Sequence, residues 1–157
     1  MDLALKSQFV PVLRKRGFKG RYPHFTRITE GKVDILGIQF SQWGDQFYLE
    51  IGIGPREGVN LSSGKLIEGD KLKHYHIVER RRVGDLSYDY SNIDPVDVAN
   101  KVIRCIESIE EWFADSNRES ILTTLRANRV AGEVFLPSPQ TTGQTGPYPA
   151  VPDGSDE

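Results

Sequence analysis

Alternating apolar and polar positions make residues 32–53 the most informative stretch of the chain. Apolar side chains recur at every second position on both sides of a short polar segment; they are Leu36, Ile38, Phe40, Phe47, Leu49, Ile51 and Ile53. Successive side chains of a strand point to opposite faces, so a period of two is typical of half-buried strands. The pattern predicts two antiparallel strands joined by a tight turn at residues 42–45.

A helix is predicted before these strands, over residues 3–16. Leu5, Phe9 and Leu13 are spaced four residues apart and therefore share one helix face. Pro11 predicts a kink or the start of a second short helix, because proline cannot donate the helical hydrogen bond. Gly17 follows a basic last turn and is predicted to end the helix, since glycine adopts the left-handed conformation at little cost.

Two further strands are predicted at residues 22–29 and 74–83. The segment between the third and fourth strands, residues 56–73, is rich in glycine, serine and charged residues, which predicts an irregular loop. A polar loop is predicted at residues 84–93. The fourth strand would place Tyr75 and Ile77 on one face.

The clearest helix is predicted to open at Asp94-Pro95. Aspartate can accept hydrogen bonds from the free amides of a first turn, and proline is tolerated at the first helical position. The apolar stripe of this helix consists of Val102, Ile106, Ile109 and Phe113, with Val98 or Ala99 before them. Asn117 is predicted to cap a further short helix.

The order of these elements predicts an α+β domain, with an antiparallel sheet of about four strands and helices packed on one face. The other face of the sheet would be partly open. We expect a single domain over residues 1–134. Residues 135–157 are rich in proline, glycine and threonine, end in acidic residues and contain no lysine or arginine, which predicts a flexible tail.

Overall charge and composition restrict the protein only loosely. The formal net charge of −2 does not exclude a nucleic-acid partner. The lone Cys105 suits a reducing compartment, and neither a membrane span nor a signal segment is visible, so we expect a soluble cytoplasmic protein. Charge is unevenly distributed, however: residues 14–32 are basic and residues 107–115 are acidic. They form either a solvated surface of mixed sign or a basic patch that attracts an acidic partner.

No catalytic or cofactor-binding signature is present. The spacing His74-x-His76 could chelate a metal from one side of a strand, but the sequence locates no third ligand. We therefore expect no metal and no cofactor. Cys105, in the middle of a predicted helix, is interpreted as a small core residue rather than a nucleophile.

The partly open sheet face is the candidate binding site. Residues out of phase with the apolar positions should share it; they are Gln39, Tyr48, Glu50, His76, Arg80 and Arg82. This face is either an ordinary solvated surface with a Glu50–Arg80 ion pair, or a binding surface on which tyrosine supplies contact area and arginine supplies forked donors. Trp43, in the predicted turn, would either fold back over the hairpin as a lid or serve as an exposed anchor.

Several segments in this order resemble one family. They are residues 13–19 (LRKRGFK), Phe25-Thr26-Arg27, residues 38–45 (IQFSQWGD), the strand at residues 47–53 and Arg82-Val83-Gly84. Together they are similar to the bacterial domain of unknown function 4304 (DUF4304) family, over roughly residues 3–113. The resemblance implies a shared fold and a bacterial cytoplasmic origin, but no established activity. Gln39, Trp43 and Arg82 match its recurring motifs without being plainly core residues.

The sequence favours a non-catalytic interaction module, similar to immunity or inhibitor proteins, that binds a macromolecular partner. We expect an unidentified protein partner, which would be acidic if the basic patch binds it, and no association with membranes. A nucleic-acid partner is kept as an alternative. The candidate partner-binding residues are Gln39, Trp43, Tyr48, His76, Arg80 and Arg82. The alternative is an enzyme acting on a phosphate-containing substrate, with Arg80 and Arg82 as anion binders and a histidine as acid or base. A deep pocket joining His76 to the arginines would favour the enzyme, and a flat face would favour the module.

Overall fold

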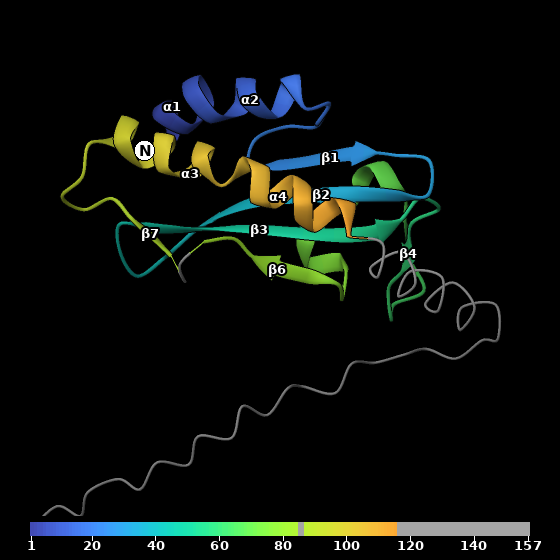
Figure 1. The fold of residues 1–157 in the computed structure, drawn as a ribbon. Coiled ribbons are helices and arrows are strands. Elements are labelled where there is room, and N and C mark those ends of the chain that lie inside the picture. Colours follow the sequence, from blue (N-terminus) through green and yellow to red (C-terminus); the bar gives the residue numbers. More distant parts are fainter. Residues whose placement is uncertain (85–86, 116–157) are drawn as a thin grey trace, which may run out of the picture.

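The computed structural model describes residues 1–84 and 87–115 as an antiparallel sheet with helices over one face (Figure 1). The helical elements are α1 (Asp2–Ala4), the π-helical η1 (Leu5–Phe9), α2 (Val10–Lys15), the 3-10 turns η2 (Gly69–Lys71) and η3 (His74–His76), α3 (Pro95–Arg104) and α4 (Ile106–Ala114). The strands are β1 (His24–Ile28), β2 (Lys32–Phe40), β3 (Gln46–Pro55), β4 (Val59–Asn60), β5 (Leu66–Ile67), β6 (Arg80–Arg82) and β7 (Tyr88–Asp89). The predicted α+β class is confirmed.

The main sheet follows the order β1-β2-β3-β6, with β7 also paired to β3. The predicted hairpin is its centre: β2 and β3 pair from Lys32↔Pro55 to Phe40↔Phe47. This register places the alternating apolar side chains of both strands on the face beneath the helices, where they form the main core with Leu5, Phe9 and Val102. The period of two therefore determines which face is buried.

The N-terminal helix changes geometry just before Pro11. The Val10 amide donates to the Leu5 carbonyl, five residues back, so that η1 is π-helical, and Pro11 lies in the first turn of α2. Gly17 ends α2 at φ +84°. Its amide donates to the Arg14 carbonyl at 3.0 Å, and the Phe18 amide donates to the Leu13 carbonyl at 3.1 Å. This pair of bonds is the Schellman arrangement, so the glycine cap is confirmed.

The second face of the sheet is not as open as predicted, because residues 56–79 fold over part of it. This segment contains the small β4–β5 ladder and both 3-10 turns. Leu72 and Ile77 pack on Val33 and Ile35, with Val59 and Ile67 beside them, and form a second core cluster. Residues 56–73, predicted to be an irregular loop, thus contain the β4–β5 ladder and η2.

The predicted fourth strand is wrong over most of its length. Residues 74–76 form η3, and only Arg80–Arg82 pair with β3. Ile77 lies over Gly52, where a Cβ would come within 2.2 Å of Ile77 Cδ1. Gly52 is also the partner of Arg80. Ile77 and Arg80 thus lie over the same sheet face, which contradicts the predicted alternation.

The C-terminal helix is interrupted at Cys105, which separates α3 from α4. Its predicted start is confirmed, since the Val96 amide donates to Asp94 Oδ1 at 2.7 Å. The predicted apolar stripe is buried, and Trp112, which the stripe did not include, is buried with it. Cys105 is only half-buried. The predicted short helix after Asn117, the domain boundary at residue 134 and the tail 135–157 lie outside the described residues.

Candidate functional site

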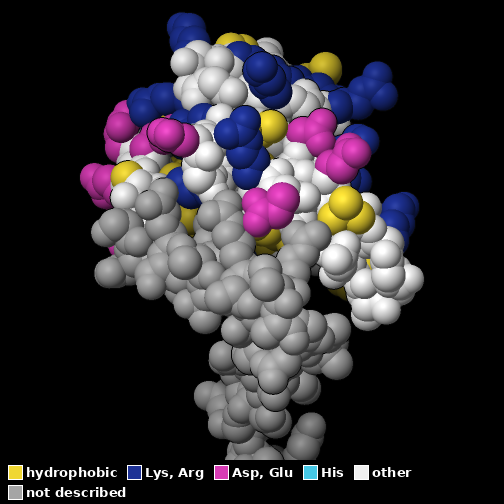
Figure 2. Space-filling view, turned by 90° about the vertical axis from the view of Figure 1, so that its right-hand side faces the viewer, with side chains coloured by type: hydrophobic (Ala, Val, Ile, Leu, Met, Phe, Trp, Pro, Cys, Tyr) yellow, Lys and Arg dark blue, Asp and Glu magenta, His cyan; other side chains and the backbone are white. Residues whose placement is uncertain are grey.

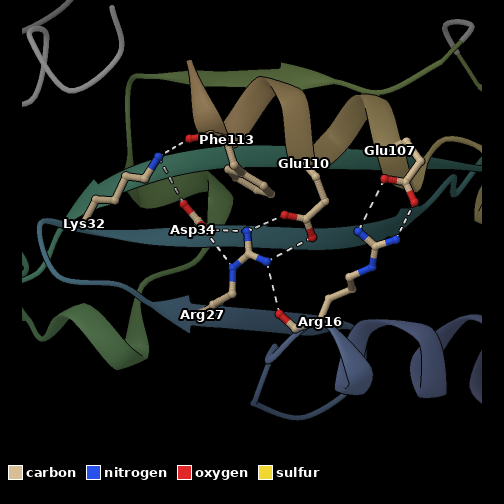
Figure 3. A network of polar contacts seen from close by, with 7 residues as sticks. All are labelled: Arg16, Arg27, Lys32, Asp34, Glu107, Glu110 and Phe113. Atoms are coloured by element: carbon tan, nitrogen blue, oxygen red, sulfur yellow. Dashed lines mark hydrogen bonds and ion pairs between the residues drawn. The ribbon is translucent and has the colours of Figure 1, made fainter. Parts of the chain in front are cut away.

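The oppositely charged segments of the sequence meet in one network at the helix–sheet interface (Figure 3). The guanidinium of Arg27 on β1 donates two hydrogen bonds to the carboxylate of Glu110 on α4, at 2.9 and 2.8 Å. Its Nε donates to Asp34 Oδ2 on β2 at 2.9 Å. Arg16 and Glu107 form a second, exposed ion pair beside it. Two residues of the basic segment, Arg16 and Arg27, are therefore paired with the acidic helix.

Asp34 is the buried end of this network, with 1% of its surface exposed. Burial raises the pKa of its carboxyl, and the hydrogen bond from Arg27 opposes that rise. Lys32 Nζ lies 3.7 Å from Asp34 Oδ1 and donates to the carbonyl of Phe113 at the end of α4. These contacts hold α4 on the sheet, so we assign the network a structural role.

The predicted basic patch is accordingly smaller than its sequence suggests. Figure 2 shows lysine and arginine side chains over the upper, helical part of the molecule, with aspartate and glutamate among and below them. Arg14 uses its guanidinium to cap the chain after α2, by donating to the carbonyls of Phe18 and Gly20. On this side of the molecule, positive and negative side chains therefore share the surface.

Four of the predicted site residues share the second sheet face, on the part that residues 56–79 leave uncovered. We call Gln39, Tyr48, Arg80 and Arg82, together with Trp43 at the hairpin tip, the Tyr48 surface. Gln39 pairs with Tyr48 across β2 and β3, and Glu50 pairs with Arg82 across β3 and β6. Strand register thus brings these side chains together as the alternation predicted.

Arg82 is held in place by two neighbours. Its Nε donates to Glu50 Oε1 at 3.1 Å, and its guanidinium carbon lies 4.2 Å from the centre of the Tyr48 ring. The side chain is still 49% exposed. The ion pair predicted between Glu50 and Arg80 is instead formed with Arg82, because Arg80 is opposite Gly52.

Trp43 is 94% exposed at the turn between β2 and β3. The prediction that it folds back as a lid over the hairpin is wrong. The turn itself is ordered by local bonds: the Trp43 amide donates to Ser41 Oγ at 3.1 Å, and the Ser41 amide donates to the Gln46 carbonyl at 2.9 Å. The indole is therefore presented to solvent by a defined turn.

His76 does not belong to the Tyr48 surface, contrary to the prediction. It lies on η3, where its Nδ1 accepts from the Lys73 amide at 3.2 Å. It joins the other two histidines of the sequence in an aromatic cluster around Tyr75: the ring centres of His24 and His74 are 5.8 Å apart, and those of Tyr75 and His76 are 4.5 Å apart. Sequence spacing could not reveal the His24–His74 contact, because the two lie on different elements.

All three imidazoles have a lowered pKa, chiefly because burial disfavours their charged form. His74 is the most enclosed, at 4% exposed, and its Nε2 lies 3.5 Å from Glu50 Oε2. Glu50 thus stands between His74 and Arg82. The site therefore offers the neutral imidazole of His74 beside the carboxylate of Glu50, which already accepts a hydrogen bond from Arg82.

A cavity of about 280 Å³ opens beside this cluster, lined among others by His24, Thr26, Leu72 and Lys73. Neither His76 nor Arg80 and Arg82 line it. In the part of the chain that the structure describes, no three His, Cys, Asp or Glu side chains are arranged to hold a metal ion. None of the described helices is long and apolar enough to cross a bilayer.

The sequence profile of the domain of unknown function DUF4304 matches residues 9–125 of the chain. The chain belongs to the DUF4304 family. No curated protein and no solved structure matches it. Membership in DUF4304 brings no activity or site residue with it.

Proposed function

We propose that this DUF4304 protein is a non-catalytic interaction module that binds another protein through the Tyr48 surface. The observation that carries the proposal is the exposure of Trp43 on an ordered turn. An indole that contributes nothing to the core gains its stabilisation only when a partner covers it. Tryptophan, tyrosine and arginine are the residues most often found at energetic centres of protein interfaces.

The dimensions of the Tyr48 surface suit a protein partner. A strand rises by about 3.4 Å per residue, so the hairpin tip and Glu50 are on the order of 20 Å apart. That length matches one side of an interface burying roughly 800 Å² per partner. Arg82 is already oriented by Glu50 and Tyr48, which lowers the entropy lost on binding. The exposed arginines of β6 favour an acidic partner.

The enzyme alternative has less support from the same geometry. Glu50 connects Arg82 to an imidazole, but that imidazole belongs to His74, which is almost fully enclosed. His76, the residue expected to act with the arginines, lies on η3 with its Nδ1 accepting a hydrogen bond. Of these two imidazoles, the one joined to the arginines through Glu50 is therefore the enclosed one.

The proposal is tested by quantitative affinity capture from the native host, followed by binding measurements with the purified candidate. Trp43→Ala and Arg82→Ala should each lower the affinity by at least roughly tenfold, as expected for central interface residues. Trp43→Ala should unfold at the wild-type temperature, because its side chain is exposed. Arg82→Ala removes the ion-pair partner of the nearly buried Glu50, so its binding is measured at a temperature at which circular dichroism shows the variant to be folded.

Matched controls are available on other elements. Leu3→Ala removes a large exposed apolar side chain from α1, and Arg104→Ala removes an exposed arginine from α3. Both controls should bind as the wild type does. If Trp43→Ala and Arg82→Ala retain full affinity for a partner that the wild type binds, the Tyr48 surface is not the interface.

A further inference from the structure

Strand β6 is an outer strand of the main sheet, and among the residues that the structure describes no strand pairs with its outer edge. Two hydrogen bonds define how β6 joins β3: the Val83 amide donates to the Leu49 carbonyl at 2.9 Å, and the Ile53 amide donates to the Glu79 carbonyl at 3.0 Å. In an antiparallel ladder, hydrogen-bonded and non-hydrogen-bonded pairs alternate. Arg80 and Arg82, opposite Gly52 and Glu50, are therefore the non-hydrogen-bonded residues of β6.

The backbone amides and carbonyls of Arg80 and Arg82 consequently point away from β3. Within residues 1–84 and 87–115, no strand pairs with this side of β6, and no backbone hydrogen bond involves these groups. All three residues of β6 are exposed. The strand thus offers two donors and two acceptors in the spacing that an added strand would use.

The side chains on this edge determine which strands can approach it. Arg80 and Arg82 lie on the second sheet face, and Arg81, opposite Ile51, lies on the other. A second copy of the protein would bring its own arginines against them, and like charges directly opposite one another are destabilising. An acidic strand would instead place carboxylates opposite guanidiniums on both faces, where charge-assisted hydrogen bonds form.

We propose that β6 binds an extended acidic segment of a partner protein as an additional β-strand. The inference rests on the proposed function and specifies its partner, because the added strand would extend the sheet beside the Tyr48 surface. The same three arginines prevent self-association at the edge and select the partner by charge. The chemical class of the ligand is an unfolded or edge-strand peptide rich in aspartate or glutamate.

The experiment uses the full-length protein and a short synthetic peptide with blocked ends, in which glutamates occupy both faces of the extended strand so that they can meet Arg81 on one face and Arg80 and Arg82 on the other. Backbone amide exchange is followed by NMR with and without the peptide. The amides of Arg80 and Arg82 should become protected on binding, whereas the amide of Arg81, within the ladder to Ile51, should change little. A peptide of the same sequence with N-methylated backbone amides on its pairing edge should fail to bind.

Arg81→Glu supplies the charge test, since Arg81 is not part of the Tyr48 surface. It should weaken peptide binding by roughly tenfold or more, while Arg104→Glu on α3 leaves it unchanged. Binding without protection of the Arg80 and Arg82 amides, or equal binding of the N-methylated peptide, would show a charge contact only and overturn the strand addition. Absence of binding would overturn it as well.

These outcomes are separable from those of the proposed function. If a native partner binds in a manner that depends on Trp43 but not on Arg81, and the amides of β6 stay unprotected in that complex, the interaction module stands and the strand addition fails. If the partner protects the amides of Arg80 and Arg82, depends on Arg81 and tolerates Trp43→Ala, the edge binds and the hairpin tip does not.

Discussion

The imidazole of His74 lies directly against Gly37 on β2. A Cβ at position 37 would come within 2.2 Å of His74 Nδ1 and 2.8 Å of Cε1. The glycine therefore provides the space in which a nearly buried histidine can rest on the sheet. This contact, together with Leu72 and Ile77, holds residues 56–79 over the second sheet face.

Gly37→Ala should displace this segment. The added methyl group cannot be accommodated without moving the His74 ring, and overpacking of this kind costs about 1–3 kcal/mol. Urea unfolding should show the loss of stability, and amide exchange should increase in residues 69–77. Gly44→Ala is the matched control, because nothing lies within 4 Å of a Cβ there; equal effects of the two substitutions would contradict the role given to Gly37.

Stability should fall as the pH is lowered from about 7.5 to 5.5. Burial lowers the pKa of His24 and His74, so the unfolded chain, with imidazoles near a pKa of about 6.5, takes up protons before the folded protein does. The stabilisation is complete above that pKa and is lost below it. Glu50 opposes the effect at His74, and Arg80, His76 and Lys73 reinforce it.

The measurement is the free energy of unfolding across this pH range for the wild type and for His74→Gln. The variant should lose less stability on acidification than the wild type does. Comparing the two slopes removes the contribution of Asp34, whose raised pKa acts in the opposite direction. Identical slopes would show that His74 does not titrate differently in the folded and unfolded states.

Arg27→Ala should be strongly destabilising. It leaves the carboxylate of Asp34 buried with only Lys32 nearby, and removal of one partner from a buried ion pair costs about 3–5 kcal/mol. Chemical denaturation measures the change. Arg16→Ala, which breaks the neighbouring exposed pair with Glu107, should leave the unfolding midpoint within experimental error; comparable losses in both variants would refute the distinction.

Ile106→Ala tests the burial of the C-terminal helices. Ile106 is the first residue of α4 and lies in the main core, so truncation should cost about 2–5 kcal/mol through lost transfer energy and a cavity. The same substitution at Ile103, which is half-buried on α3, should lower the free energy of unfolding clearly less. A negligible effect at position 106 would mean that the end of α3 and the start of α4 do not pack as described.

Regular periodicity explains which parts of this fold could be predicted from the sequence. The alternation from Leu36 to Ile53 determined the hairpin and its buried face, and Gly17 and Asp94 marked helix ends by local chemistry that needs no tertiary context. For the same reason the membership of Gln39, Tyr48 and Arg82 in one surface was predicted correctly. Each of these depends on contacts within a strand, between neighbouring strands or within one helical turn.

The remainder depends on contacts between distant segments. Leu72 packs on the sheet from a segment that shows no helix or strand period, and His74 reaches Gly37 only because the chain folds back after β5. A ten-residue strand was predicted at residues 74–83 because apolar residues happen to alternate near its start. Trp43 lies in the turn, outside the alternating pattern of the two strands. Only the conformation of that turn determines whether its indole is exposed.

The anchor between Lys32 and the last turn of α4 has a practical consequence for experiments. Lys32 begins β2, so α4 ends at the opposite end of the sheet from the hairpin tip, whereas the first residues of the chain lie at the same end as that tip (Figure 1). A purification tag or surface tether at the N-terminus would start at the same end of the sheet as the hairpin tip that carries Trp43. Attachment through the chain that continues from Asp115 starts at the far end and leaves the indole facing outward.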